Sequence, residues 1–327
     1  MGHQAVNMTP SLSNPSRATF WLLTALQLRG VGVAAGRKLA EWKFGKAPQP
    51  SSDDSFFEAI SNRVEIDSEA RARASAIIEK CAAHSIWVIS LADDAYPSRL
   101  REIKDAPPVI YVKGSLDALS VYGCAVVGTR NASDIGLKIA HRIAGVLAKR
   151  QLSTISGLAL GIDAAAHAGA LDEHGITVTI LAHGLDTVAP SSNRKLADRI
   201  LELGGAWVSE HEPGVPPRPA EFVRRNRLQS GMALCSIIVE SGAIGGSIHQ
   251  ARFTKEQGRP VLAVLPDLEK CPAGNFNTEG GKYLVQNIGA IPLRSTDELS
   301  DYLTQLTKAL VVSKSGGATT SQLNLFE

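Results

Sequence analysis

The sequence contains little cysteine, and the few cysteines are scattered. Among its 327 residues there are four, Cys81, Cys124, Cys235 and Cys271. No two of them form a Cys-x-x-Cys pair, which argues against a structural zinc site and a dithiol redox motif. Dense disulfide frameworks are typical of small secreted domains. We therefore expect reduced thiols in the core of a cytoplasmic protein.

The sequence also lacks a strong excess of charge and is poor in aromatic residues. The formal net charge is +2, and Phe, Trp and Tyr together make up 5% of the chain. A net charge this small creates no global field that would attract a polyanion, so a polyanion site has to be a local patch. With few aromatic rings, stacking on bases should contribute less than contacts with phosphates.

Membrane and metal-binding motifs are missing as well. No apolar run is long enough to span a bilayer, and residues 1–17 lack the apolar core of a signal peptide. The eight histidines include no His-Glu-x-x-His motif, and His167 and His174 are seven positions apart, which is not a metal-ligand spacing. We expect no membrane contact, no bound metal and no cofactor.

One stretch organises the rest of the chain, residues 156–167 with the sequence SGLALGIDAAAH. An apolar segment runs directly into Gly157 and Gly161, and an alanine-rich helical pattern follows. In an open α/β sheet such a junction lies at the carboxyl edge of the strands, where ligands bind. The glycines let the backbone turn tightly, and the first N–H groups of the helix favour an anion. A glycine-rich crossover without a ligand is the alternative.

From residue 122 onward, short apolar segments alternate with amphipathic ones. The expected strands are 124–128, 152–156, 177–182, 206–209, 236–240 and 261–265, and the expected helices are 135–149, 162–174, 193–203, 222–233 and 247–257. Repeated strand–helix units of this length predict an α/β fold with a doubly wound, mostly parallel sheet. The first strand ends in Gly128-Thr129-Arg130 instead of Gly-x-Gly-x-x-Gly, which disfavours a dehydrogenase.

The N-terminal part predicts a helical accessory domain. Residues 19–40 indicate two short helices around the turn Arg29-Gly30-Val31-Gly32. Such a turn is similar to a helix-hairpin-helix, whose backbone N–H groups bind phosphate without reading sequence. A plain helical hairpin packed on the next domain is the alternative. The expected division is a flexible tail at 1–17, a helix-hairpin-helix or SAM-like domain at 18–85, a Rossmann-like domain at 86–310 and a flexible tail at 311–327.

Groups that can bind an anion follow the ends of several expected strands. Parallel strands end at the same edge of a sheet, so these groups should gather there. Arginine forks, hydroxyls and helix N-termini suit phosphate oxygens. The candidate phosphate-binding residues are Gly128, Thr129, Arg130, Asn131, Ser156, Gly157, Arg194, Lys195, Arg224, Arg225, Asn226, Arg227, Gly245, Gly246 and Ser247.

The order and spacing of the motifs resemble one known family. The motifs are Gly128-Thr129-Arg130, the 156–167 stretch, Gly184-Leu185-Asp186, Ser209-Glu210, Arg225-Asn226-Arg227, Gly246-Ser247 and Gln257-Gly258-Arg259. Over about residues 93–266 the chain is similar to the DNA-processing protein A family (DprA/Smf). It departs from the family pattern at Ala189-Pro190, Phe222-Val223, Gly245, His249 and Asp267 and is identified as a divergent member.

This resemblance implies a Rossmann-like domain that binds and protects single-stranded DNA. It also implies a homodimer that helps load the RecA recombinase in natural transformation and recombination. By the same resemblance, Arg130 and residues 224–227 would contact phosphates. We expect binding to be independent of base sequence and sensitive to salt.

Asp163 and His167 are four residues apart, on one face of the expected helix. They would form either an acid–base pair or two structural groups, with Asp163 at the helix start and His167 packed inside. No nucleophile accompanies them, so we expect no enzyme. A nucleotide hydrolase would need a carboxylate soon after Gly246, and the next one is Glu256. A nucleotide sensor or defence module on the same fold is a further alternative.

The C-terminal segment carries a separate signal. Residues 322–326, QLNLF, resemble the short peptide that docks on the sliding clamp of DNA polymerase. The preceding Gly/Ser/Thr run would present the peptide, and Leu323, Leu325 and Phe326, after Gln322, would fill an apolar groove. An apolar terminus that packs on its own domain is the alternative.

Overall fold

The structure is a computed structural model that describes residues 11–44, 54–267 and 275–315. The predicted clamp-binding peptide at 322–326 and most of both predicted tails lie outside these residues. Of the cysteines, Cys81, Cys124 and Cys235 are free and buried, as expected, and Cys271 lies outside the described residues. Over the described residues, every helix is too short or too polar to cross a bilayer.

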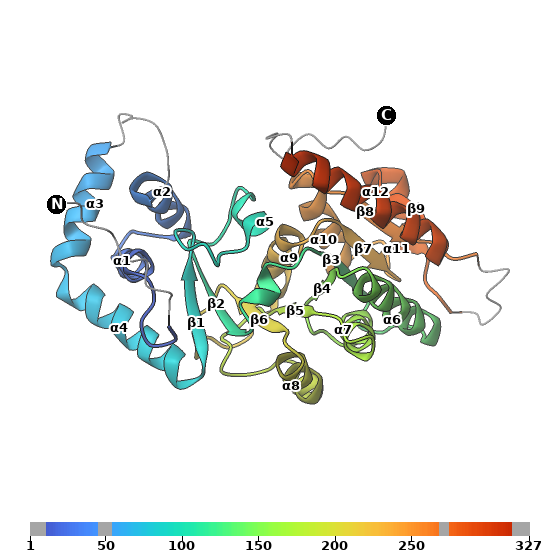
Figure 1. The fold of residues 1–327 in the computed structure, drawn as a ribbon, viewed down its shortest axis with the longest axis horizontal. Helices are drawn as coiled ribbons and strands as arrows, with labels where there is room; N and C mark the ends of the chain where they lie inside the picture. Colours follow the sequence, from blue (N-terminus) through green and yellow to red (C-terminus); the bar gives the residue numbers. More distant parts are fainter. Residues whose placement is uncertain (1–10, 45–53, 268–274, 316–327) are drawn as a thin grey trace.

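The strands that the structure describes form one nine-stranded sheet (Figure 1). They are β1 (Ile86–Ser90), β2 (Val109–Gly114), β3 (Gly123–Gly128), β4 (Ser153–Ser156), β5 (Thr177–Ile180), β6 (Ala206–Ser209), β7 (Ser236–Val239), β8 (Val261–Val264) and β9 (Ile291–Leu293). Their order across the sheet is β1-β2-β6-β5-β4-β3-β7-β8-β9. The strands from β6 across to β9 are parallel, whereas β1 and β2 are antiparallel to their neighbours. The predicted doubly wound, mostly parallel sheet is confirmed.

Helices connect and flank these strands. They are α1 (Arg17–Leu26), α2 (Val33–Phe44), α3 (Asp54–Ile66), α4 (Ser68–Ala83), α5 (Ser98–Arg101), α6 (Asp134–Lys149), α7 (Ile162–Asp172), α8 (Arg194–Glu202), α9 (Pro219–Met232), α10 (Gly246–Glu256), α11 (Glu279–Ile288) and α12 (Thr296–Ser315), with short 3-10 helices η1 (Asp117–Leu119) and η2 (Ser191–Asn193). Side-chain caps fix some of their starts. At α6, for example, Ser133 Oγ accepts a 3.0 Å hydrogen bond from Gly136 N–H.

The two faces of the sheet bury separate cores because side chains alternate along each strand. On β3, Val126 packs in a cluster with side chains of α6, α7 and α12. The next residue, Val127, belongs to a second cluster with side chains of α10 and α11. The chain winds outward from β3 through β4, β5 and β6, then returns to β7 on the other side of β3. The neighbours β3 and β7 therefore mark the point where the winding direction reverses.

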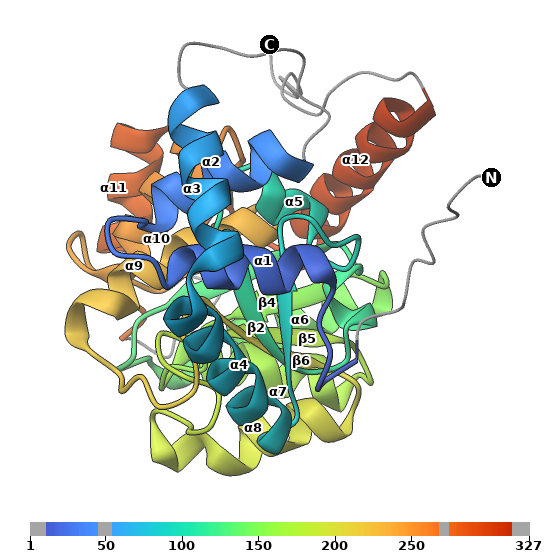
Figure 2. The same ribbon diagram turned by 90° about the vertical axis from the view of Figure 1, so that its left-hand side faces the viewer.

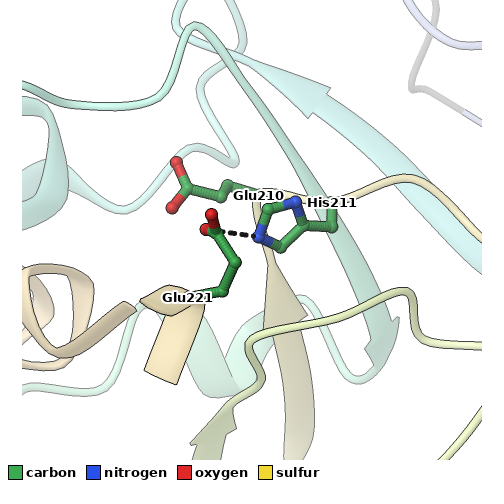
Figure 3. A group of neighbouring side chains, drawn as sticks. All are labelled: Glu210, His211 and Glu221. Atoms are coloured by element: carbon green, nitrogen blue, oxygen red, sulfur yellow. Dashed lines mark hydrogen bonds and ion pairs between the residues drawn. The ribbon is translucent and has the colours of Figure 1, made fainter. Parts of the chain in front are cut away.

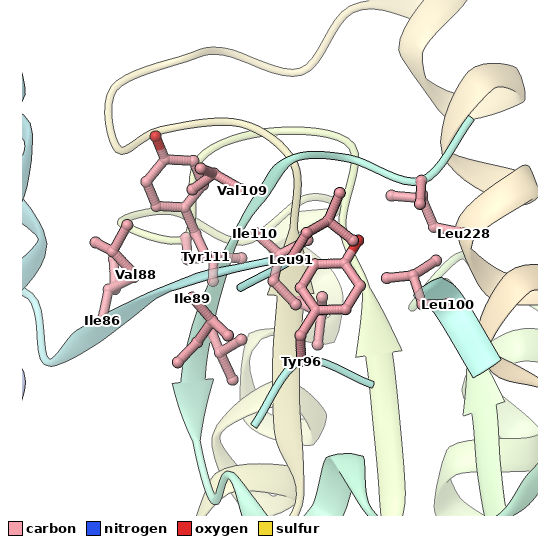
Figure 4. Close-up of a cluster of buried hydrophobic side chains, with 14 of the residues drawn as sticks. Ile86, Val88, Ile89, Leu91, Tyr96, Leu100, Val109, Ile110, Tyr111 and Leu228 are labelled. Atoms are coloured by element: carbon pink, nitrogen blue, oxygen red, sulfur yellow. The ribbon is translucent and has the colours of Figure 1, made fainter. Parts of the chain in front are cut away.

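The N-terminal helices pack against the β1–β2 edge (Figure 2). Leu22 of α1 belongs to the same hydrophobic cluster as Ile89 of β1 and Ile110 of β2. Figure 4 shows this cluster continuing through Tyr96 to Leu228 of α9. The accessory helices and the sheet thus share one continuous core. The predicted domain boundary near residue 85 stays a prediction.

The predicted flexible tail at 311–327 needs correction. Helix α12 continues to Ser315, so residues 311–315 of that predicted tail are helical. Helix α11 was not predicted, because Gly280 and Gly281 lower its helix propensity. Close packing explains these glycines, since a Cβ on Gly280 would lie 2.0 Å from Ser241 Oγ. Here tertiary contacts override local propensity.

Candidate nucleic-acid interface

A cleft opens where the winding of the sheet reverses, at the carboxyl ends of β3 and β7. Its volume is about 510 Å³. In open α/β sheets this is the position at which ligands bind. Its walls come from the turns after β3, β4 and β7, from the first turns of α7 and α10, and from α9. The lining residues are Val127, Gly128, Thr129, Arg130, Ala159, Asp163, Pro219, Phe222, Val223, Arg225, Asn226, Gln229, Ser241, Gly242, Ile244, Gly245, Gly246 and Ser247.

Arg130 is the exposed cation of this cleft. Its guanidinium carbon lies 5.3 Å from the centre of the Phe222 ring, close enough for a cation–π contact. The preceding turn is fixed by backbone bonds, because Thr129 N–H donates to Glu240 O at 2.9 Å and Thr129 O accepts from Ile162 N–H at 3.2 Å. The ring and the turn hold the exposed Arg130 guanidinium at the cleft.

The N-terminus of α10 faces the same cleft. Its N-cap is Gly245, with a φ of 142° and no side-chain capping bond. The first intrahelical bonds run from Ile248 and His249 N–H to Gly245 O. The preceding N–H groups, of Gly246 and Ser247, are therefore available to an anion. Asn226 Nδ2 donates to Gly246 O at 3.1 Å and so ties α9 to this turn.

Arg225 lines the inner wall of the cleft and is only 5% exposed. Its Nη1 donates to Gly157 O at 3.0 Å and also to Ile180 O. Burial lowers the pKa of Arg225 to about 10, and the carboxylate of Asp163 acts in the opposite direction. Arg225 thus braces the turn after β4 from inside. Ser156 and Gly157 are buried in the same turn.

Asp163 completes this internal bracing. Its carboxylate accepts from Gly157 N–H at 3.0 Å and from Ala159 N–H at 3.4 Å. Burial raises the pKa of Asp163, while the Arg225 guanidinium and the two backbone bonds favour the charged form. The carboxylate therefore orders the loop that precedes α7.

His167 is fully buried, and its hydrogen bond is to Thr177, not to Asp163. The Nδ1 atom lies 2.6 Å from Thr177 Oγ1, which itself donates to Thr154 O. Burial lowers the pKa of His167 to about 3, with the charge of Arg225 adding to the effect. The ring is therefore neutral at ordinary pH. The geometry corresponds to the packing role that the sequence analysis weighed against an acid–base pair.

The other arginines of the 224–227 run have internal partners. Arg227 is 4% exposed, with Nε 2.9 Å from Asp105 Oδ2 and Nη2 2.5 Å from Glu210 Oε2. Arg224 is more open, with 47% of its side chain exposed, and lies 3.9 Å from Glu210 and 4.0 Å from Glu221. Only Arg224 of this pair can reach a ligand without breaking a buried ion pair.

Arg194 and Lys195 are exposed residues at the start of α8. They lie on the same edge of the sheet, because Asn193 Nδ2 donates to Leu158 O at 2.9 Å in the turn after β4. Arg194 is 4.0 Å from Asp198. Arg194 and Lys195 thus lie on the edge of the sheet that holds the cleft, but outside the cleft itself.

The structure thus brings together part of the predicted set. Gly128, Thr129, Arg130, Arg225, Asn226, Gly245, Gly246 and Ser247 line the cleft, whereas Asn131, Ser156, Gly157, Arg194, Lys195, Arg224 and Arg227 do not. The direct role of each in binding stays a prediction. Sequence reasoning missed the apolar rim at Phe222 and Ile244, the latter 93% exposed. The only feature of the sequence that pointed to this rim was the departure from the family pattern at Phe222-Val223.

A second group that sequence reasoning missed lies beside α9. Ligand atoms of Glu210, His211 and Glu221 lie within 4.8 Å of one another (Figure 3). The expectation of no metal rested on the spacing of histidines, and a Glu-His pair followed ten residues later by a glutamate has no standard metal-ligand spacing. The fold, not the spacing, brings these groups together.

The comparisons with known proteins agree with the family resemblance. The family model for DNA recombination-mediator protein A matches residues 87–304. Protein Smf of Escherichia coli is 38% identical over 216 residues, which is 66% of this chain and 56% of Smf. DNA processing protein DprA of Streptococcus pneumoniae is 38% identical over 175 residues, 54% of this chain and 61% of that protein. This chain thus matches little more than half the length of these relatives.

Solved structures show the same architecture. The structure of DprA from Streptococcus pneumoniae superimposes with a TM-score of 0.69 at 28% identity, covering 90% of this chain and 98% of that one. DprA from Helicobacter pylori, described for its unique single-stranded DNA binding mode, has a TM-score of 0.59 at 24% identity over 67% of this chain and 96% of that one. On the family match, which spans most of the sheet, this chain belongs to the DNA recombination-mediator protein A (DprA/Smf) family.

Proposed function

We propose that this protein binds single-stranded DNA along the carboxyl edge of its sheet, without cleaving it. The observation that carries the proposal is the pairing of exposed Arg130 with the uncapped N-terminus of α10 across one cleft. The Arg130 guanidinium offers charged N–H donors, and the N-terminus of α10 offers backbone N–H groups. Both kinds of donor bind phosphate oxygens. The single-stranded DNA binding described for the Helicobacter pylori relative supports the choice of ligand.

The edge offers more than one phosphate position. Arg194 and Lys195 continue it on one side of the cleft, and Arg224 adds a half-exposed guanidinium on α9. Proteins that bind single strands follow the backbone with a positively charged groove, so a track of several cations suits a polymer better than a mononucleotide. The exposed Ile244 and the Phe222 ring offer apolar surface to bases.

We further propose that the protein acts in the cytoplasm as a homodimer, protecting single strands and helping to load RecA. Family membership supports this setting, in natural transformation or recombination. RecA filament nucleation on a coated single strand would be measured with and without the protein. Faster nucleation is expected, and an unchanged lag would contradict the RecA role while leaving DNA binding intact.

The clamp-binding peptide is a separate proposal. Pull-down of the full chain by purified sliding clamp is expected to be lost in a Leu323→Ala/Phe326→Ala double variant. Retention of the double variant on the clamp would contradict it.

The central test is fluorescence anisotropy with labelled single- and double-stranded oligonucleotides over a salt series. We expect tighter binding of the single strand, with affinity that rises with oligonucleotide length and falls with salt. Competition with a mononucleotide distinguishes DNA binding from the two alternatives, a nucleotide sensor and a nucleotide hydrolase. Full displacement by a mononucleotide, with no length dependence, would contradict the proposal.

A further inference from the structure

The acidic–histidine cluster beside α9 has chemistry that the proposed DNA-binding edge does not use. Glu210 and His211 directly follow β6, and Glu221 lies in the first turn of α9. His211 Nε2 is 3.1 Å from Glu221 Oε2. Figure 3 shows the Glu210 carboxylate beside the Glu221 carboxylate, with the imidazole on the other side of Glu221.

Glu210 has an unsatisfied oxygen within this cluster. Only 7% of its side chain is exposed. Its Oε2 is held by Arg227 Nη2 at 2.5 Å, but its buried Oε1 has no hydrogen-bond partner among the described residues. A buried carboxylate oxygen without a donor is costly. A positively charged group bound at Oε1, where the Arg224 guanidinium comes no closer than 3.9 Å, would offset this cost.

The charged side chains around the cluster are not balanced. Three carboxylates, of Asp105, Glu210 and Glu221, surround two guanidiniums, of Arg224 and Arg227. Arg224 is only 3.9 to 4.0 Å from the two glutamates, at the limit of an ion pair. Among these five side chains the carboxylates outnumber the guanidiniums by one.

We propose that Glu210, His211 and Glu221 bind a divalent transition-metal ion of the Zn²⁺ class. One carboxylate oxygen from each glutamate and Nε2 of His211 would be the ligands, in place of the present His211–Glu221 bond. An imidazole with two carboxylates is a ligand set that Zn²⁺ accepts. Arg227 would hold Glu210 from outside, as hydrogen-bonded partners of metal-ligating carboxylates commonly do.

Because the cluster adjoins the cleft wall and Arg224, a metal bound there would affect the DNA-binding edge. Glu221 directly precedes Phe222 of the cleft wall and is also an ion partner of Arg224. A metal would draw both glutamates away from Arg224 and release its guanidinium for phosphate. It would also join the end of β6 to the start of α9. This second step rests on the proposed function, whereas the site itself does not.

The test is isothermal titration of the metal-free full chain with ZnCl₂. We expect one site per chain, weakened at least about tenfold in His211→Ala and in Glu221→Gln, because each removes one ligand. His141→Ala is the matched control, since His141 also contacts a carboxylate, Asp172 at 2.9 Å, but on an open surface. Circular dichroism shows whether each variant is folded.

The results distinguish the metal site itself from its proposed effect on DNA binding. Zinc binding that is equal in the wild type, His211→Ala and Glu221→Gln, or absent in all, would overturn the site. Anisotropy with single-stranded DNA then tests the coupling, where zinc should tighten binding by the wild type but not by His211→Ala. Single-site zinc binding by a protein that binds no DNA would uphold the site and contradict the proposed function instead.

Discussion

At the scale of single residues, the glycine that ends β3 is under a steric constraint. A Cβ at Gly128 would lie 1.8 Å from Val239 O on the neighbouring β7. We predict that Gly128→Ala lowers the free energy of unfolding by about 1–3 kcal/mol, because backbone must move to accommodate the methyl group. Urea denaturation would measure it. Gly32→Ala is the control, because a Cβ there meets no atom within 4 Å, and an equal loss in both variants would contradict the prediction.

His167 should give the protein a distinct pH dependence. In the unfolded chain its pKa is near 6.5, and in the folded protein it is about 3. The unfolded state therefore binds more protons between these values, so stability falls as the pH falls below 6.5, by up to about 1.4 kcal/mol per pH unit. We predict that His167→Gln removes this contribution to the slope.

Denaturation of wild type and variant from pH 7 to pH 4 measures the difference. Asp163 is present in both proteins, so its own titration cancels. His249→Gln, a change at an exposed histidine, should leave the slope unchanged. A wild-type slope in His167→Gln would show that the imidazole is not held neutral by burial.

At the scale of elements, the N-terminus of α10 provides the sharpest contrast between stability and binding. A carboxylate in the first turn of a helix stabilises it by about 0.3–1 kcal/mol, but in this cleft it would repel a phosphate. We predict that Ser247→Asp leaves the melting temperature equal or higher and weakens binding of single-stranded DNA about tenfold, or about 1.4 kcal/mol. Ser247→Asn is the uncharged control. Unchanged affinity in Ser247→Asp would place the phosphates elsewhere.

The elements were also what the sequence predicted best. Alternation of apolar and amphipathic segments placed β3 to β8 and α6 to α10 within a few residues, because each strand is buried on both faces. Because these strands are parallel, the sequence also predicted that their carboxyl ends lie at one edge of the sheet.

The burial of individual arginines could not be predicted from a run of like charges. Arg224, Arg225 and Arg227 are close in sequence, yet the helix directs Arg224 to solvent and buries the other two.

At the scale of the whole molecule, the N-terminal helices and the sheet should unfold together. Leu22 of α1 is fully buried in the cluster that continues through β1 and β2. We predict that Leu22→Ala destabilises the entire chain by about 2–5 kcal/mol. Hydrogen exchange would then accelerate in β2 and β6 as well as in α1. Faster exchange confined to α1–α4 would show that the accessory helices unfold independently.

The most direct test of the central claim is the salt dependence of single-stranded DNA binding by Arg130→Ala. Each phosphate contact contributes about 0.7 to the slope of log affinity against log salt for a single strand. We predict weaker binding and a slope reduced by about 0.7 in Arg130→Ala, with no change in Arg142→Ala, an exposed arginine on α6 that lies outside the cleft. The wild-type slope and affinity in Arg130→Ala would contradict a phosphate site at this cleft.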